Sequence, residues 1–98
     1  MNLHHFQTSV FSDNALSLYL QYSRPSDTIL LAGDAVNAIM SSQWRAKLAG
    51  KNVRVLTSDL QARGLNDKLA AITDLSIQVI DYNEFVQLTL THDKVITW

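Results

Sequence analysis

Five short apolar segments, separated by stretches with helical spacing, constrain this chain more than any other feature. The run at 28–31 has no alternation with polar residues, as is typical of a strand covered on both faces. Four further strand-like segments are found at 3–6, 53–56, 76–80 and 94–98. This alternation of strands and helices predicts one layered α/β domain over residues 1–98. We expect a mainly parallel five-stranded sheet with helices on both faces.

Helical spacing predicts the intervening elements. Apolar residues at 15, 18, 19 and 22 share one face, and a longer helix is expected over 36–48 before Gly50. Shorter helices are expected over 59–64 and 66–71, and a last helix follows residue 81. Because short side-chain oxygens are favoured at helix N-termini, we interpret four residues first as caps. These are Asp34, Ser58, Asp59 and Asp81.

Composition and charge exclude several classes of protein. The chain is 47% hydrophobic and 17% charged with a net charge of −1, which is typical of a compact domain and disfavours direct nucleic-acid binding. So low a charge also predicts that part of the surface is covered by other subunits. Neither a signal peptide nor an apolar stretch approaching the roughly 20 residues of a membrane span is visible. We therefore expect a soluble, cytoplasmic protein.

The residues offer little catalytic machinery. The chain has no cysteine and no Gly-rich phosphate loop, so we expect no thiolate chemistry and no nucleotide cofactor. His4 and His5 are adjacent on a predicted strand and must point to opposite faces, which disfavours a metal site. A small enzyme using Asp34, Ser58 or Arg63 remains an alternative, although no base of a Ser/His/Asp arrangement is evident.

Three segments carry a resemblance to a known family. They are the run 29–36, the run 59–65 with its Arg-Gly-Leu, and the run 80–89, followed by a last strand that ends at Trp98. Their order and the chain length resemble the TusB/DsrH-like proteins of the DsrE/DsrF/DsrH superfamily. Some members of the superfamily carry a persulfide on a cysteine eight residues before the Gly of the Arg-Gly pair. Leu56 occupies that position here.

The resemblance implies a function without direct chemistry. It implies a non-catalytic subunit of a heteromeric sulfur-relay complex that serves 2-thiolation of the wobble uridine of tRNA. Its partners would be TusC-like and TusD-like paralogues and a TusE-like sulfur carrier. A subunit of a dissimilatory sulfur-oxidation complex of the DsrEFH type is the alternative branch, and the missing cysteine disfavours it.

Five residues are candidates for subunit contacts. Arg63, beside Gly64, is either a solvated helix-end cation or part of an anion-tolerant pocket, as in a homo-oligomeric small-anion-binding module. Tyr82, Phe85 and Trp98 would form one apolar patch if the last helix and last strand lie side by side. Ordinary packing is favoured for Phe85, and an interface role is favoured for Trp98.

Overall fold

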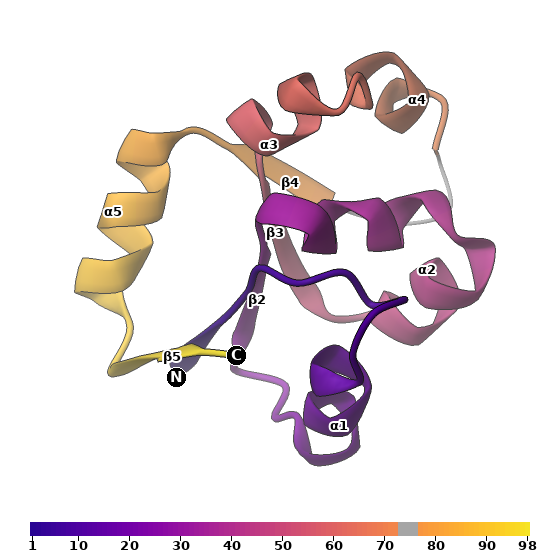
Figure 1. Cartoon of the computed structure of the whole chain (residues 1–98). Coiled ribbons are helices and arrows are strands. Elements are labelled where there is room, and N and C mark those ends of the chain that lie inside the picture. Colours follow the sequence, from indigo (N-terminus) through magenta and orange to yellow (C-terminus); the bar gives the residue numbers. More distant parts are fainter. Residues whose placement is uncertain (73–76) are drawn as a thin grey trace.

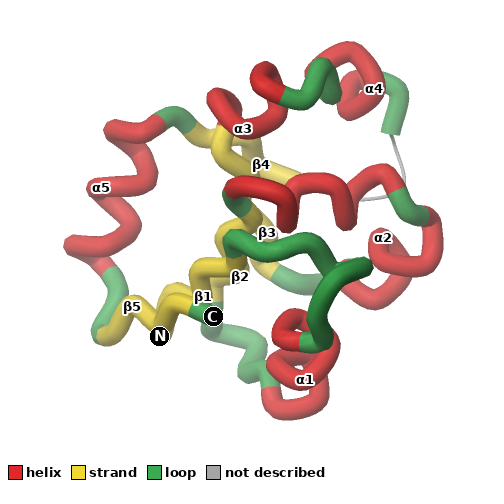
Figure 2. Tube along the Cα trace, viewed as in Figure 1, coloured by secondary structure: helices red, strands yellow, loops and turns green. Residues whose placement is uncertain are grey.

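The computed structural model describes residues 1–72 and 77–98, which form a layered α/β domain (Figure 1). Its described part contains one five-stranded sheet, seen at the centre of Figure 2. The strands are β1 (Asn2–Phe6), β2 (Thr28–Leu31), β3 (Asn52–Leu56), β4 (Ile77–Ile80) and β5 (Lys94–Thr97). The helices are α1 (Ala15–Tyr22), the 3₁₀ helix η1 (Gly33–Met40), α2 (Ser42–Leu48), α3 (Thr57–Ala62), α4 (Asn66–Ala70) and α5 (Tyr82–Thr91). Residue 76, the start of one predicted strand, lies outside the described residues.

The sheet has the order β4-β3-β2-β1-β5, and every neighbouring pair of these described strands is parallel. The first strand is therefore internal, between β2 and β5, and the last strand forms an edge of the sheet. In that register His4 lies opposite Ile29 on one side and Ile96 on the other. The predicted parallel sheet is confirmed.

The two faces of the sheet carry unequal layers. One face holds the larger core, where Ile29, Leu31 and Val55 pack against residues from α1, η1, α2 and α3. The other face holds a small cluster around Leu30 and Ile80, covered by α5. Figure 1 shows α5 standing alone on its side of the sheet, opposite α1 and α2. Helices on both faces are confirmed.

The helix predicted over 36–48 is divided in two. The backbone at Ser41 is extended, with φ −98° and ψ 124°, and separates η1 from α2. Its Oγ accepts a hydrogen bond from the Trp44 backbone N–H at 3.4 Å and so caps α2. Apolar spacing continues across the break, which explains why the sequence pattern did not reveal it.

Only one of the four predicted caps is confirmed. Asp81 accepts from the Glu84 N–H at 2.8 Å while the Glu84 side chain accepts from the Asp81 N–H at 3.3 Å, a capping box at the start of α5. The other predictions were wrong, because η1 and α3 are preceded by residues whose side chains make no cap bond. These N-cap positions are Ala32 and Leu56.

Candidate functional site

The carboxyl ends of the strands, where open α/β sheets place their sites, meet at one edge of the sheet. Leu56 ends β3 there, and its side chain is only 8% exposed within the cluster that covers the α5 face. Half-buried Phe85 and Leu88 of α5 pack against that cluster. Leu56, the position at which the sequence resemblance implied a persulfide cysteine in other proteins, is thus a core side chain in this structure.

A hydrogen bond from Gly33 to Asp59 joins the ends of β2 and β3. Asp59 Oδ2 accepts from the Gly33 backbone N–H at 2.9 Å, so this carboxylate ties α3 to the start of η1 instead of capping α3. Gly33 has φ +52°, and a Cβ there would lie 2.8 Å from the Gln7 carbonyl oxygen. The close approach to the loop after β1 requires glycine.

Arg63 is held by the carboxylates on either side of it. Its Nη2 and Nε donate to Asp34 Oδ1 at 2.7 and 3.2 Å, and its Nη1 donates to the Asp59 carbonyl oxygen at 3.1 Å. The guanidinium therefore acts as a cross-link between η1 and α3. Gly64, at φ +64°, follows it in the turn to α4. This geometry favours a structural role over an anion pocket, because acidic groups already neutralise the cation.

His5 lies on the α5 face of β1, and the sequence reasoning did not predict that it packs beneath this helix. Its ring centroid is 5.3 Å from that of Phe85, and the residue is 9% exposed. Burial lowers the pKa of His5, and the nearby Asp59 carboxylate partly opposes that shift. A neutral imidazole here belongs to the packing under α5.

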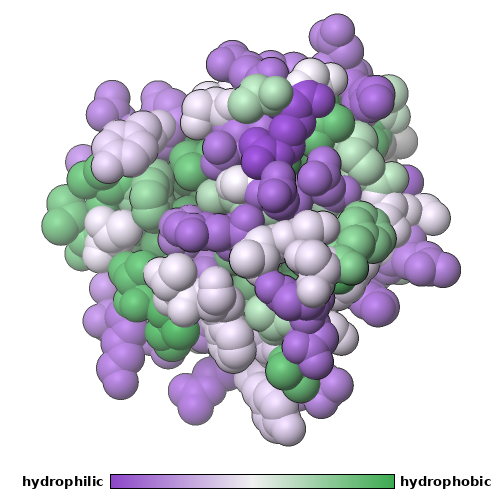
Figure 3. All heavy atoms as spheres, viewed as in Figure 1, coloured by the Kyte–Doolittle hydropathy of each residue, from purple (hydrophilic) through white to green (hydrophobic). Residues whose placement is uncertain are grey.

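The helix α5 presents apolar side chains to solvent as well as to the sheet. None of its residues is fully buried. Tyr82 is 70%, Val86 39% and Leu90 73% exposed, and their four-residue spacing places them on one stripe. Figure 3 shows apolar side chains gathered over this helix and over β5 below it. Exposed apolar surface of this kind is a mark of protein interfaces.

Trp98 does not share a patch with Tyr82 and Phe85, which corrects the single-patch prediction. Its ring stacks on Phe6 at 5.8 Å between centroids and lies against Tyr19 at 6.1 Å, on the face that carries α1. Tyr82 and Phe85 contact each other, at 5.9 Å, on the α5 side. The two aromatic groups are on opposite faces because Trp98 packs with Phe6 and Tyr19 of the larger-core face, whereas Phe85 packs against the cluster that α5 covers.

A buried polar network beside Trp98 was also missed by the sequence reasoning. The indole Nε1–H donates to His4 Nδ1 at 3.0 Å, and His4 Nε2 lies 3.2 Å from Asp27 Oδ2 without the alignment of a hydrogen bond. Tyr19 donates to the same Asp27 oxygen at 3.4 Å. Burial lowers the pKa of His4 against the opposing pull of Asp27, and it raises the pKa of Tyr19 to about 12. No local spacing rule connects residue 4 to residues 27 and 98.

This network forms the floor of a hollow between α1 and β5 with a volume of about 340 Å³. We call it the corner hollow. It is lined by Asn2, His4, Tyr19, Tyr22, Arg24, Asp27, Lys94 and Trp98.

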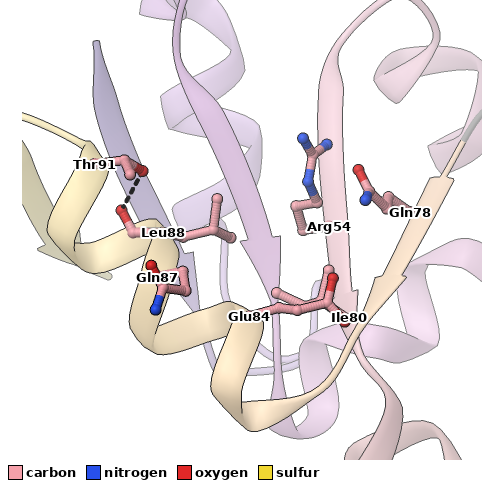
Figure 4. A pocket seen from close by; sticks show the side chains of 7 residues that line it. All are labelled: Arg54, Gln78, Ile80, Glu84, Gln87, Leu88 and Thr91. Carbon is pink, nitrogen blue, oxygen red and sulfur yellow. Dashed lines mark hydrogen bonds between the residues drawn. The ribbon is translucent and has the colours of Figure 1, made fainter.

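A groove of about 280 Å³ lies between α5 and strands β3 and β4 (Figure 4). Apolar Ile80 and Leu88 are flanked there by side chains that can form hydrogen bonds. These are Arg54, Gln78, Glu84, Gln87 and Thr91.

Over residues 1–72 and 77–98, no group of three or more His, Asp or Glu side chains is arranged to hold a metal ion. Among the helices in that part of the chain, none is both long enough and apolar enough to cross a membrane.

The arrangement as a whole is that of a parallel α/β domain with a buried leucine at the end of β3 and exposed apolar side chains on α5. The family model "DsrH like protein" matches residues 8–95. The chain therefore belongs to the DsrH-like family.

Relatives in several bacteria agree with this membership. "Protein TusB" of Buchnera aphidicola subsp. Baizongia pistaciae is 30% identical over 98 residues, covering 98% of this chain and 99% of that protein. "Protein TusB" of Yersinia pestis (strain Pestoides F) is 36% identical over 86 residues, with 85% and 86% covered. "Protein TusB" of Photorhabdus laumondii is 39% identical over 69 residues, with 70% and 65% covered.

The fold also has a solved counterpart. The crystal structure of the ychN protein from E. coli superposes with a TM-score of 0.75 at 19% identity, covering 99% of this chain and 97% of that one. At that identity the likeness concerns the fold alone.

Proposed function

We propose that this chain is a non-catalytic subunit of a heteromeric sulfur-relay complex that serves 2-thiolation of the wobble uridine of tRNA. The single observation that carries the proposal is the carrier position: the chain has no cysteine, and Leu56 at that position is 8% exposed. A persulfide carrier needs an accessible thiolate, so a buried leucine leaves a docking or scaffolding role. Similarity to proteins named TusB supports the tRNA branch over dissimilatory sulfur oxidation.

The proposed partners are TusC-like and TusD-like paralogues and a TusE-like carrier, in the cytoplasm. Only 17% of the residues are charged, and the Tyr82, Leu90 and Trp98 side chains are exposed. Both features support such contacts. Phe85 is half-buried beneath α5, and Arg63 is ion-paired at the sheet edge. We therefore assign Phe85, Arg63 and Gly64 to the scaffold that presents the docking surfaces.

Affinity capture of the chain from its native cells, with partners identified by mass spectrometry, tests the proposal. We expect two paralogues of similar size that carry cysteines. Recovery of the chain alone as a homo-oligomer would refute the proposal and favour the small-anion-binding alternative. Sulfurtransferase activity of the isolated chain would favour the enzyme alternative instead.

Single substitutions on the two aromatic surfaces sharpen that test. Tyr82→Ala and Trp98→Ala should each reduce co-purification of the paralogues, because large exposed aromatics supply much of the binding energy at interfaces. Phe11→Ala is the matched control, since Phe11 is also exposed, at 70%, but lies outside both surfaces. Unchanged co-purification of Tyr82→Ala and Trp98→Ala would count against the docking role of these residues.

The closed carrier position can be tested by introducing a thiol. We expect Leu56→Cys to react with an aromatic disulfide reagent at least about tenfold more slowly than Ser58→Cys, because burial raises a thiol pKa and blocks access. Residue 58 is exposed two positions further along α3 and provides the matched control. Equal reaction rates would mean that the carrier geometry is still open.

A further inference from the structure

We propose that the corner hollow between α1 and β5 binds an acidic polypeptide segment of a partner protein. The segment would place a carboxylate at the rim formed by Arg24 and Lys94 and an apolar side chain against Tyr22 and Trp98. This inference rests on the proposed docking function and names a surface and a partner chemistry for it.

The shape of the corner hollow fits a side chain better than a whole ligand. Its floor is buried, with His4 6%, Tyr19 4% and Asp27 7% exposed. Its rim is open, with Tyr22 80% and Trp98 42% exposed. The volume of about 340 Å³ is at the lower end of the range of about 300–1,000 Å³ for small-molecule sites. A partner side chain with its flanking backbone matches that size.

Charge at the rim favours an acidic partner. Arg24 and Lys94 are exposed, and neither forms an ion pair with any residue in the described ranges. Asp27 is the acidic group of the hollow, and its oxygens are turned inward. Its Oδ1 accepts from the Asn2 backbone N–H at 3.2 Å, and its Oδ2 accepts from Tyr19 and faces His4. Arg24 and Lys94 therefore present two exposed cations beside the buried carboxylate of Asp27, and complementary charge selects partners of the opposite sign.

The Trp98 side chain is held in one orientation in the free chain. Its indole is fixed by the hydrogen bond to His4 and by stacking on Phe6 at an interplanar angle of 10°, although the residue is 42% exposed. Rigid aromatic anchors lose little conformational entropy on binding, which is why they dominate interface energetics.

Among the described residues, one buried atom of the floor, His4 Nε2, has no well-aligned hydrogen-bond partner. Because His4 Nδ1 accepts from the indole, a neutral ring carries its proton on Nε2, which is buried 3.2 Å from Asp27 Oδ2 without the alignment of a hydrogen bond. Unpaired buried donors are rare in native structures.

Titration of the isolated chain with a short peptide of alternating glutamate and leucine tests the proposal. We would follow the indole N–H signals of the two tryptophans by NMR. The Trp98 signal should shift saturably, whereas that of Trp44, which is 9% exposed, should stay in place and report that the fold is intact. A peptide of alternating lysine and leucine should leave both signals unchanged.

A second hollow of about 300 Å³ provides a matched control, because it also carries two cations, Lys47 and Lys51. There Lys51 donates to Ser23 Oγ at 2.9 Å, and Lys47 lies 4.5 Å from the Trp44 ring. Arg24→Glu/Lys94→Glu should weaken glutamate-peptide binding at least about tenfold, whereas Lys47→Glu/Lys51→Glu should change it less than about twofold. If the first double variant does not fold, Arg24→Gln should give a smaller loss in the same direction.

Three results would overturn the proposal: no shift of the Trp98 signal, equal binding of the lysine peptide, or equal losses in both double variants. The titration needs no paralogue, so its failure leaves the result of affinity capture unaffected. Conversely, a chain that captures no paralogues but binds the glutamate peptide would refute the proposed function and keep the corner hollow as a binding site.

Discussion

The two faces of the sheet differ in how completely their helices cover them. On the face with α1, η1 and α2, fifteen buried residues form one cluster. On the α5 face the buried cluster has five members, and α5 itself buries none of its residues completely. Burial of apolar area is the main source of stability, so the first face holds the fold together. The second face leaves apolar side chains of α5 exposed, and these are the side chains that the proposed docking function would use.

We expect the largest effect when a leucine on each face is replaced by alanine and the losses of stability are compared. Leu31 is 0% exposed in the larger cluster, whereas Leu88 of α5 is half-buried. Leu31→Ala should lower the free energy of unfolding by about 3 kcal/mol, and Leu88→Ala by about 1 kcal/mol, because a cavity costs more where surroundings cannot relax. Urea denaturation measures both values. Equal losses would remove the distinction between the two faces.

A backbone substitution comes next in size. Gly33→Ala should cost about 2 kcal/mol, because alanine at positive φ is strained and its Cβ would meet the Gln7 carbonyl oxygen at 2.8 Å. Gly64→Ala is the control, since Gly64 also has positive φ but nothing within 4 Å of the added Cβ. It should cost about 1 kcal/mol in the same urea titration. A larger loss at Gly64 would contradict the close packing at the β2–η1 corner.

Removing the cap of α5 should have a smaller effect. Asp81→Ala deletes the capping box and should cost about 1 kcal/mol, measured by thermal or urea unfolding. Asp81→Asn keeps an acceptor oxygen and should cost clearly less. If the alanine variant were as stable as the parent chain, α5 would owe its position to packing rather than to its cap.

The smallest effect is a pH dependence with a contribution from each face. Burial lowers the pKa of His4 on one face and of His5 on the other. As the pH falls below 6.5, the ordinary pKa of histidine, the unfolded chain therefore binds more protons than the folded chain. Stability should therefore decline as pH falls below 6.5, with a slope under about 1.4 kcal/mol per pH unit for each histidine. His4→Gln and His5→Gln should each flatten the curve. A curve that rises toward acid would contradict the assignment of neutral rings.

Much of the fold could be predicted because the strand signals are local. The run at 28–31 has no polar interruption, and it became the strand β2, covered on both faces. The caps at Asp34 and Asp59 were mispredicted for a physical reason. A carboxylate before a helix has a local preference for the backbone N–H, but here each found a partner that is distant in sequence. Asp34 pairs with Arg63 and Asp59 with Gly33, 29 and 26 residues away.

The candidate site was less predictable, because it depends on the direction of single side chains. The last helix and last strand are adjacent in sequence, which suggested one aromatic patch. The Trp98 ring instead lies on the α1 face, where it donates a hydrogen bond to His4. The period of two along a strand predicted correctly that His4 and His5 separate. Nothing in the spacing indicated which of them would meet the buried carboxylate of Asp27.

Pairing of β1 with β5 links residues that are far apart along the chain. Asp93 N–H donates to the Met1 carbonyl oxygen and Trp98 N–H to the His5 carbonyl oxygen, both at 2.9 Å. Closing so long a loop carries a large entropic cost, and short edge strands are among the first elements to open locally. The corner hollow exists only while this pairing holds. A partner bound there would therefore stabilise the pairing of β5 with β1 and slow the local unfolding of the last strand.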